Sequence, residues 1–195
     1  MDSGTVVIRP FEEGDRERLR EILKTVASYT VKGGKNPGKK ECLCWMYSDY
    51  YFDWEPQNVL CAVDDGELCG FIVASTEPEL FQSKMREIYV PKIRRVSKIW
   101  AFFHLICLRV NRKQDEKGGA AFHINIDNGH QGKKIGTKLM DAMAALCAER
   151  GKDYLYLVTE GKQTAGYKFY RRIGFHETKH YPGGSVMLAK SVKTL

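Results

Sequence analysis

The sequence predicts a mixed α/β fold with hairpins and a crossover, and three observations support this prediction. Short runs in which apolar and polar residues alternate are typical of strands, and longer stretches with apolar residues at helical spacing separate them. The Asp65-Gly66 pair between two apolar runs indicates a hairpin. Near the centre of the chain, a strand, a long helix and a further strand indicate a crossover. A length of 195 residues suits one domain with a full core.

The N-terminal residues predict a strand followed by a helix. Residues 5–9 alternate and are rich in β-branched side chains, which favours a strand. Pro10 is expected to end this strand, and Asp15 is expected to cap a helix that extends to about Ala27. One βα unit therefore opens the fold.

A basic loop, an aromatic helix and the hairpin follow. Residues 32–38 are rich in Gly, Pro and Lys, which is typical of a flexible loop, and we expect this loop to border a substrate cleft. Residues 44–52 predict a short helix rich in Trp and Tyr. Residues 58–63 and 68–75 predict the two hairpin strands.

The middle of the chain has a helical pattern from 77 to 110, in which Pro91 is expected to separate two helices. Residues 99–108 are strongly apolar but far shorter than the roughly 20 residues that span a bilayer. We interpret them as part of the core, with a role at a membrane surface as the alternative. Residues 113–119 predict a polar loop.

The last third predicts the crossover and two closing strands. Gly151 is expected to end the long helix in a left-handed conformation. The expected elements after it are a strand at 154–158, a helix at 164–173 ended by Gly174, and strands at 176–179 and 185–189.

Residues 125–137 are the most informative stretch, because they predict a strand end, a glycine-rich turn and a helix start in succession. The alternating residues of the strand are Phe122, Ile124 and Ile126. A helix N-terminus presents unpaired N–H groups and the positive end of the helix dipole, which favour an anion. Gly132 and Gly136 would let the backbone approach that anion closely. The stretch therefore predicts a phosphate site.

Composition narrows the partners and the compartment. The six cysteines are scattered, and Cys42 and Cys44 lack a second pair at zinc-ligand spacing, so we expect no metal and reduced, mostly buried thiols in the cytoplasm. The net charge of +7 is not concentrated in a run flanked by stacking aromatics, which favours a small polyanion over nucleic acid. The N-terminal sequence resembles no secretory signal, and no membrane partner is predicted.

In their order, these motifs resemble the GNAT superfamily of N-acetyltransferases, and the resemblance covers most of the chain. Residues 8–10 with Asp15 resemble the opening strand and helix of that family, and residues 65–72 resemble its hairpin between the second and third strands. Residues 169–175 resemble the closing helix and strand. The segment similar to the family's acetyl-CoA signature comprises Gln131, Gly132, Lys133, Lys134, Ile135 and Gly136.

The resemblance implies a single GNAT domain over residues 1–195, with a mixed, mostly antiparallel sheet of about six to seven strands and helices on both faces. It implies acetyl-CoA as co-substrate and no metal. The residues that it places against acetyl-CoA are Ile124, Asn125, Ile126, Gln131, Gly132, Lys133, Lys134, Ile135, Gly136, Thr137 and Gln163. At Lys134 the family usually has glycine. Its side chain either points away or adds charge beside the pyrophosphate, or else it obstructs the cofactor.

Two residues are candidates for catalysis. Tyr170 matches the family's tyrosine acid, which would donate a proton to the leaving thiolate; the alternative is a tyrosine that only packs between helix and sheet. His123 is the candidate base, because imidazole exchanges protons near neutral pH. A structural histidine and a proton route through water are the alternatives, and no glutamate occupies this strand.

The resemblance therefore implies an N-acetyltransferase that moves an acetyl group from acetyl-CoA directly to a primary amine of a small molecule or a peptide. A catalytically silent GNAT-like module that binds a protein or another ligand is the alternative, suggested by Lys134 and by the missing glutamate. The acceptor stays open, as does the oligomeric state, a homodimer included. Aromatic residues that would form either a substrate wall or core are Trp45, Tyr47, Tyr50, Tyr51 and Trp54.

Overall fold

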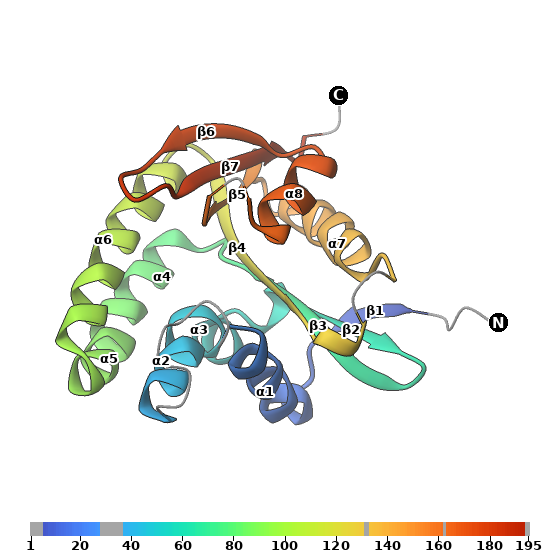
Figure 1. The fold of residues 1–195 in the computed structure, drawn as a ribbon, viewed down its shortest axis with the longest axis horizontal. Helices are drawn as coiled ribbons and strands as arrows, with labels where there is room; N and C mark the ends of the chain where they lie inside the picture. Colours follow the sequence, from blue (N-terminus) through green and yellow to red (C-terminus); the bar gives the residue numbers. More distant parts are fainter. Residues whose placement is uncertain (1–5, 28–36, 131–132, 162, 194–195) are drawn as a thin grey trace.

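One seven-stranded sheet, in the order β1-β2-β3-β4-β5-β7-β6, organises the chain (Figure 1). The computed structural model describes residues 6–27, 37–130, 133–161 and 163–193. The strands are β1 (Val7–Pro10), β2 (Val59–Asp64), β3 (Glu67–Ala74), β4 (Gly119–Ile126), β5 (Tyr154–Thr159), β6 (His176–His180) and β7 (Val186–Ser191). Among these strands β4 and β5 are parallel, whereas the other neighbours are antiparallel. The predicted mixed, mostly antiparallel fold class is confirmed.

Helices cover both faces of the sheet. Their bounds are η1 (Glu13–Asp15), α1 (Arg16–Val26), α2 (Pro37–Tyr47), α3 (Asp49–Trp54), η3 (Pro56–Asn58), α4 (Pro78–Lys84), the π-helical turn η4 (Met85–Tyr89), α5 (Val90–Val96), α6 (Lys98–Asp115), η5 (Asn128–His130), α7 (Ile135–Glu149) and α8 (Ala165–Arg172). Helices α1 to α6 pack with one face and α7 and α8 with the other, so the core forms two layers (Figure 1).

Strand alternation sorts the hairpin side chains between these two layers. Cys61, Phe71 and Val73 belong to the layer of α1 to α6, whereas Ala62 and Ile72 belong to the layer of α7 and α8. The register pairs Cys61 with Phe71 and Ala62 with Gly70, as period-two alternation in an antiparallel pair requires. Because both faces are covered, these strands are almost continuously apolar.

The hairpin turn confirms the prediction from the Asp-Gly pair. Asp65 and Gly66 have φ of 51° and 82°, and β2 pairs with β3 on either side of them. Positive φ at both central residues gives the twist that a two-residue hairpin needs.

Two local predictions near the N-terminus need correction. Asp15 is the N-cap residue of α1, but its carboxylate makes no capping bond. It accepts hydrogen bonds from both terminal nitrogens of Arg9 at 2.7 Å and from the backbone N–H of Glu12 at 2.9 Å, and so ties the helix start to β1. The second correction concerns the aromatic helix, which begins at Pro37 rather than near Cys44. Residues 32–36 of the predicted basic loop lie outside the described residues, and its residues 37 and 38 begin α2.

The prediction that Pro91 separates two helices is wrong. Pro91 is the second residue of α5, and the helical path continues from α4 through the π-helical turn η4 into α5. The break falls at Ser97, which is extended at φ −154° and ψ 112°. The Ser97 hydroxyl accepts from the backbone N–H of Trp100 at 3.3 Å and caps α6.

Helix α6 differs from its prediction in the exposure of one face and in the residue at which it ends. It continues to Asp115, into the segment predicted as a loop. Residues 99–108 are only half core, since Ala101, His104 and Leu108 are buried whereas Phe102 and Phe103 are more than half exposed. No described helix has the length and apolar character needed to cross a membrane.

Candidate active site

The central parallel pair of strands separates along its length. Strand β4 pairs with β5 only from Gly119 to Ala121, opposite Tyr154 to Tyr156. Beyond Ala121, β4 continues beside β3 as far as Ile126, whereas β5 continues beside β7 as far as Thr159. The two strands therefore diverge in the middle of the sheet, and the β5 side of β4 loses its strand partner.

Backbone groups of β4 are directed into this opening. Ala121 accepts a hydrogen bond from the N–H of Ser75, and Asp127 donates one to Cys69, so both residues face β3. In a strand, the N–H and C=O of one residue both face the same neighbouring strand, and those of the next residue face the other side. The register from 122 to 126 has no shift, so this alternation continues along β4. Ile124 and Ile126 consequently direct their backbone groups toward the β5 side.

Helix α7 begins beside the opening, and its N-cap residue is Lys134. This residue has φ 60° and ψ 13°, the left-handed conformation, and its side chain is exposed and makes no capping bond. The first intrahelical bond runs from the N–H of Lys138 to the carbonyl of Lys134 at 3.1 Å. The N–H groups of Ile135, Gly136 and Thr137 therefore have no acceptor within the helix and suit an anion.

The left-handed conformation explains why the family usually has glycine at this position. An L-residue costs about 1–2 kcal/mol there, and glycine costs nothing. Lys134 takes the backbone shape that glycine would take and directs an exposed side chain outward from it. The substitution thus affects conformational energy and charge rather than the path of the chain.

Gly136 has a different reason to be glycine. It is buried, and a Cβ atom would lie 3.0 Å from Cζ of Phe169 and 3.3 Å from Cδ1 of Ile126. The missing side chain makes room for α8 and β4. Gly136 thereby sets how closely α7 approaches both elements.

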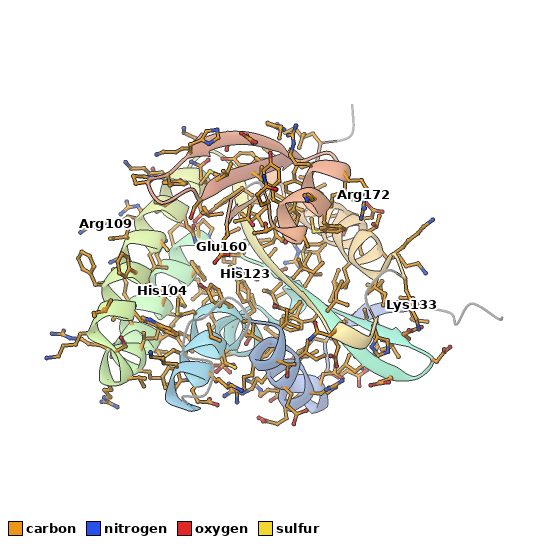
Figure 2. The ribbon with its side chains drawn as sticks, viewed as in Figure 1. His104, Arg109, His123, Lys133, Glu160 and Arg172 are labelled. Carbon is orange, nitrogen blue, oxygen red and sulfur yellow. The ribbon has the colours of Figure 1, made fainter. Side chains whose placement is uncertain are left out.

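Lys133 is joined to the hairpin of β2 and β3. Its Nζ lies 2.5 Å from Oδ2 of the buried Asp64, and this contact raises the pKa of Lys133. Figure 2 shows Lys133 on the hairpin side of the molecule. Lys133 therefore holds the turn against β2. Gln131 and Gly132, also predicted to contact the cofactor, lie outside the described residues.

Tyr170 lies in α8 against β4, 9% exposed, and its ring is 5.8 Å from that of Phe122 and 5.5 Å from that of Phe175. Burial raises the pKa of the phenol well above its usual value of 10, so it stays protonated. Within the described residues its hydroxyl has no hydrogen-bond partner. The side chain both packs in the core and keeps an unused donor.

His123 extends from β4 to the opposite face of the sheet. Its ring lies 4.8 Å from that of Tyr47 and 6.4 Å from that of Tyr51. Burial, with a smaller contribution from His104, lowers the pKa of His123 to about 4, so the imidazole is neutral at pH 7. Asn125 lies on the same face of β4 by strand alternation.

His104 is a site residue that the sequence reasoning missed. It is 5% exposed on the inner side of α6, and burial lowers its pKa to about 4. In Figure 2 it lies between His123, at the centre of the molecule, and the outer edge formed by α6. Its Nε2 and the Tyr51 hydroxyl are buried without a hydrogen-bond partner in the described part of the chain. A buried polar atom without any partner costs about 1–3 kcal/mol, so water or a ligand is expected to satisfy these two.

A fully buried carboxylate, Glu55, lies behind this cluster and was also missed. It accepts hydrogen bonds from Tyr50 at 2.8 Å, Asn58 at 2.5 Å, and the backbone N–H of Thr76 at 2.8 Å. No local motif marks Glu55, because its partners come from α3, η3 and the end of β3. These donors fully satisfy the carboxylate, and it anchors α3 to the sheet.

Gln163 is exposed at the end of the segment between β5 and α8. It lines an open depression together with Glu160, Gly161, Thr164, Gly183 and Ser185. Thr164 also caps α8, because its hydroxyl accepts from the N–H of Tyr167 at 3.2 Å. The depression lies where β5 has already diverged from β4. Gln163 thus lies on the β5 side of the opening.

A diverging parallel pair beside the N-terminus of a long helix offers backbone donors both to a carbonyl oxygen and to an anion. The chain belongs to the Acetyltransferase (GNAT) family, whose model matches residues 32–175. No curated protein sequence matches the chain significantly. Membership makes the chain an acetyltransferase by class, with acetyl-CoA as the acetyl donor of the family.

Solved structures agree on the fold. SsHAT superposes with a TM-score of 0.77 at 20% identity, and the match covers 97% of this chain and 100% of SsHAT. PaiA N-acetyltransferase from Thermoplasma acidophilum, in complex with coenzyme A, has a TM-score of 0.62 at 17% identity, with 96% and 99% covered. YncA, a putative acetyltransferase from Salmonella typhimurium with acetyl-CoA, has a TM-score of 0.61 at 14% identity, with 96% and 94% covered.

Proposed function

We propose that this protein transfers an acetyl group from acetyl-CoA directly to a primary amine of a small molecule or a peptide. The observation that carries the proposal is the divergence of β4 from β5 beside the start of α7. It presents backbone donors of Ile124 and Ile126 on one side and the free N–H groups of a helix N-terminus on the other. The donors of β4 suit a thioester carbonyl, and the N–H groups at the start of α7 suit a pyrophosphate.

The backbone donors of β4 would stabilise the charge that forms during transfer. When the amine nitrogen attacks the thioester carbon, the carbonyl oxygen becomes negative until the C–S bond breaks. A backbone N–H of Ile124 or Ile126 directed at that oxygen lowers the barrier, because it is fixed before the reaction starts. Removing one such donor typically costs about 100-fold to 1000-fold in rate.

His123 is suited to accept a proton on the face of β4 that packs with α1 to α6, but burial limits its strength as a base. It is neutral at pH 7, but a pKa of about 4 makes it a much weaker base than an alkyl amine, whose usual pKa is about 10.4. It therefore cannot strip a proton from an ammonium ion efficiently. We infer that the acceptor enters the reaction as the neutral amine, and that His123 receives the second proton, which the attacking nitrogen loses as the amide forms.

Tyr170 is suited to serve the leaving group. Its neutral phenol is a hydrogen-bond donor on the face of the sheet that packs with α7 and α8. Because burial raises its pKa, it first stabilises the departing thiolate as a donor; a proton from solvent then completes the thiol, and His123 returns the proton of the amine to solvent. The net reaction converts amine and thioester to amide and thiol, with no net proton uptake.

The silent-module alternative rested on Lys134 and on the missing glutamate. The left-handed backbone of Lys134 favours an intact phosphate loop, and its exposed ammonium adds positive charge near it.

The six cysteines are free thiols, five of them buried, which supports the proposal that the protein works in a reducing compartment such as the cytoplasm.

Calorimetric titration with acetyl-CoA followed by a coupled CoA-release assay on a panel of amines tests the proposal. We expect acetyl-CoA to bind and at least one amine to accelerate CoA release above the rate of hydrolysis. Small amines and peptides with a free amine are compared at equal concentration. Failure to bind acetyl-CoA would reject the transferase and leave the silent module, and binding of acetyl-CoA without transfer to any amine would also favour that module, whereas transfer that depends on the phosphate loop would eliminate it.

A further inference from the structure

The outward face of α6 carries a stripe of exposed apolar side chains. Ile99, Phe102, Phe103 and Ile106 are 67%, 62%, 59% and 41% exposed. Their spacing of three, four and seven residues places them on one face of the helix, and we call them the outer stripe. The rings of Phe102 and Phe103 contact one another, with centroids 5.9 Å apart.

The outer stripe does not belong to the core of this chain. The core side of α6 is formed by Ala101, His104 and Leu108, all at most 5% exposed. At 3.6 residues per turn these residues lie on the face opposite the outer stripe. Figure 1 shows α6 at the outer edge of the molecule, beside α5 and α4. The helix is therefore apolar on two faces, and one of them is uncovered.

Positive charge surrounds the outer stripe. The 27 residues from 88 to 114 contain seven of the 31 basic residues and none of the 24 acidic ones, so the rest of the chain has equal numbers of both. All seven are exposed, namely Lys92, Arg94, Arg95, Lys98, Arg109, Arg112 and Lys113. Figure 2 shows Arg109 at the outer edge, far from Arg172. The net charge of the protein thus belongs to this one segment.

We propose that the outer stripe and its seven basic residues bind the surface of an anionic lipid membrane, with α6 lying along the interface. Phenylalanine and isoleucine side chains on one face, with lysine and arginine beside them, are the features of an interfacial helix. The apolar side chains enter the boundary between headgroups and acyl chains, and the cations attract anionic headgroups.

Charge favours a membrane over a second copy of the chain as the partner of this surface. In a two-fold symmetric dimer the same surface meets itself, so the basic residues of one copy would face those of the other. Like charges placed across an interface oppose association. An anionic membrane offers both the hydrocarbon and the opposite charge.

Flotation of the full chain with vesicles tests the proposal. The vesicles are phosphatidylcholine alone, or phosphatidylcholine with phosphatidylserine at about 3:1. We expect the protein to float with the anionic vesicles at low salt, and to float less as salt rises, because salt screens the attraction. Failure to float with anionic vesicles at low salt would overturn the proposal, as would equal flotation with both kinds.

Paired variants separate the apolar and charged contributions. Phe102→Ser with Phe103→Ser should lower partitioning at least about tenfold, whereas Val7→Ser, at a half-exposed apolar residue on β1, should not change it. The fold is expected to survive, since both rings are exposed. If the double variant floats as well as the wild type, the outer stripe is not the membrane contact.

The charge variants have the same change in net charge. Lys98→Glu with Arg109→Glu should reduce partitioning at least about 25-fold, and the control Arg150→Glu with Arg172→Glu should have a much smaller effect. Equal effects in both pairs would mean that net charge alone acts, which contradicts a defined surface. A wild-type dimer that the Phe102→Ser and Phe103→Ser variant dissociates, without vesicle binding by either, would assign the stripe to a second copy and reject the membrane.

Discussion

Replacing Lys134 by glycine and by alanine separates the two effects of a lysine in the phosphate loop. Lys134 has φ 60°, which costs an L-residue about 1–2 kcal/mol. Glycine removes this cost but loses about 0.5–1 kcal/mol of conformational entropy on folding. We therefore expect Lys134→Gly to stabilise the protein by about 0.5–1 kcal/mol. Lys134→Ala keeps the Cβ atom and its cost, so its stability should stay within about 0.5 kcal/mol of wild type.

Denaturant unfolding of the three proteins under identical conditions measures this difference. For a chain of this size, about 1 kcal/mol corresponds to a shift of the melting temperature of roughly 2–4 °C. Equal stabilities of the glycine and alanine variants would refute the conformational reasoning, because they differ at this position mainly in the cost of a left-handed backbone.

Titration of the same proteins with acetyl-CoA measures the charge. Both variants lose the exposed ammonium, so both should bind acetyl-CoA more weakly by a similar factor of about fivefold, which corresponds to roughly 1 kcal/mol for one partly screened charge. Unchanged affinity in both would show that Lys134 contributes no attraction for the phosphates.

Four further predictions follow from the geometry of the site. Tyr170→Phe should lower kcat by about 100-fold or more while acetyl-CoA affinity, measured by calorimetry, stays unchanged; full turnover would remove the acid role. The logarithm of kcat/KM should rise with pH at a slope of one up to the pKa of the amine, without an inflection between pH 5 and 8, because the pKa of His123 is about 4. His104 has a pKa of about 4 in the folded protein and 6.5 in the unfolded chain, so the free energy of unfolding falls as pH drops below about 6.5. His104→Leu should therefore remove about 2 kcal/mol of the stability loss between pH 7.5 and 5, measured by urea unfolding at both pH values. An unchanged stability loss in the variant would contradict the burial of His104. Gly136→Ala should cost about 1–3 kcal/mol because its Cβ would meet an aromatic ring at 3.0 Å, whereas the control Gly129→Ala, with nothing within 4 Å, should cost little in the same unfolding measurement.

Local signals predicted the elements of the sheet well. The Asp65-Gly66 turn could be predicted because positive φ is a property of the two residues themselves. The stop after α7 at Gly151, which follows the C-cap residue Arg150 and has φ 73°, is local for the same reason. Pro91 misled because the helical path continues past it, directly after the π-helical turn η4, and no local pattern in the sequence indicates that turn.

The site was harder to predict where it depends on contacts between distant segments. His123 could be proposed from its place on the central strand, but its low pKa results from burial and from His104, which α6 brings close. Glu55 acquires its role only through donors from three other elements. Likewise α6 has two apolar stripes, and periodicity alone does not tell which one the core covers.

The two glycine positions of the phosphate loop show why a sequence signature needs a physical interpretation at each position. At Lys134 the requirement is a left-handed backbone, which a lysine meets at a cost of about 1–2 kcal/mol without any clash. At Gly136 the requirement is space, and even a methyl group would meet Phe169 and Ile126 within 3.3 Å. A departure from the signature at the first position therefore leaves the loop intact, whereas a departure at the second would move α7 away from the strand that directs its backbone groups toward the site.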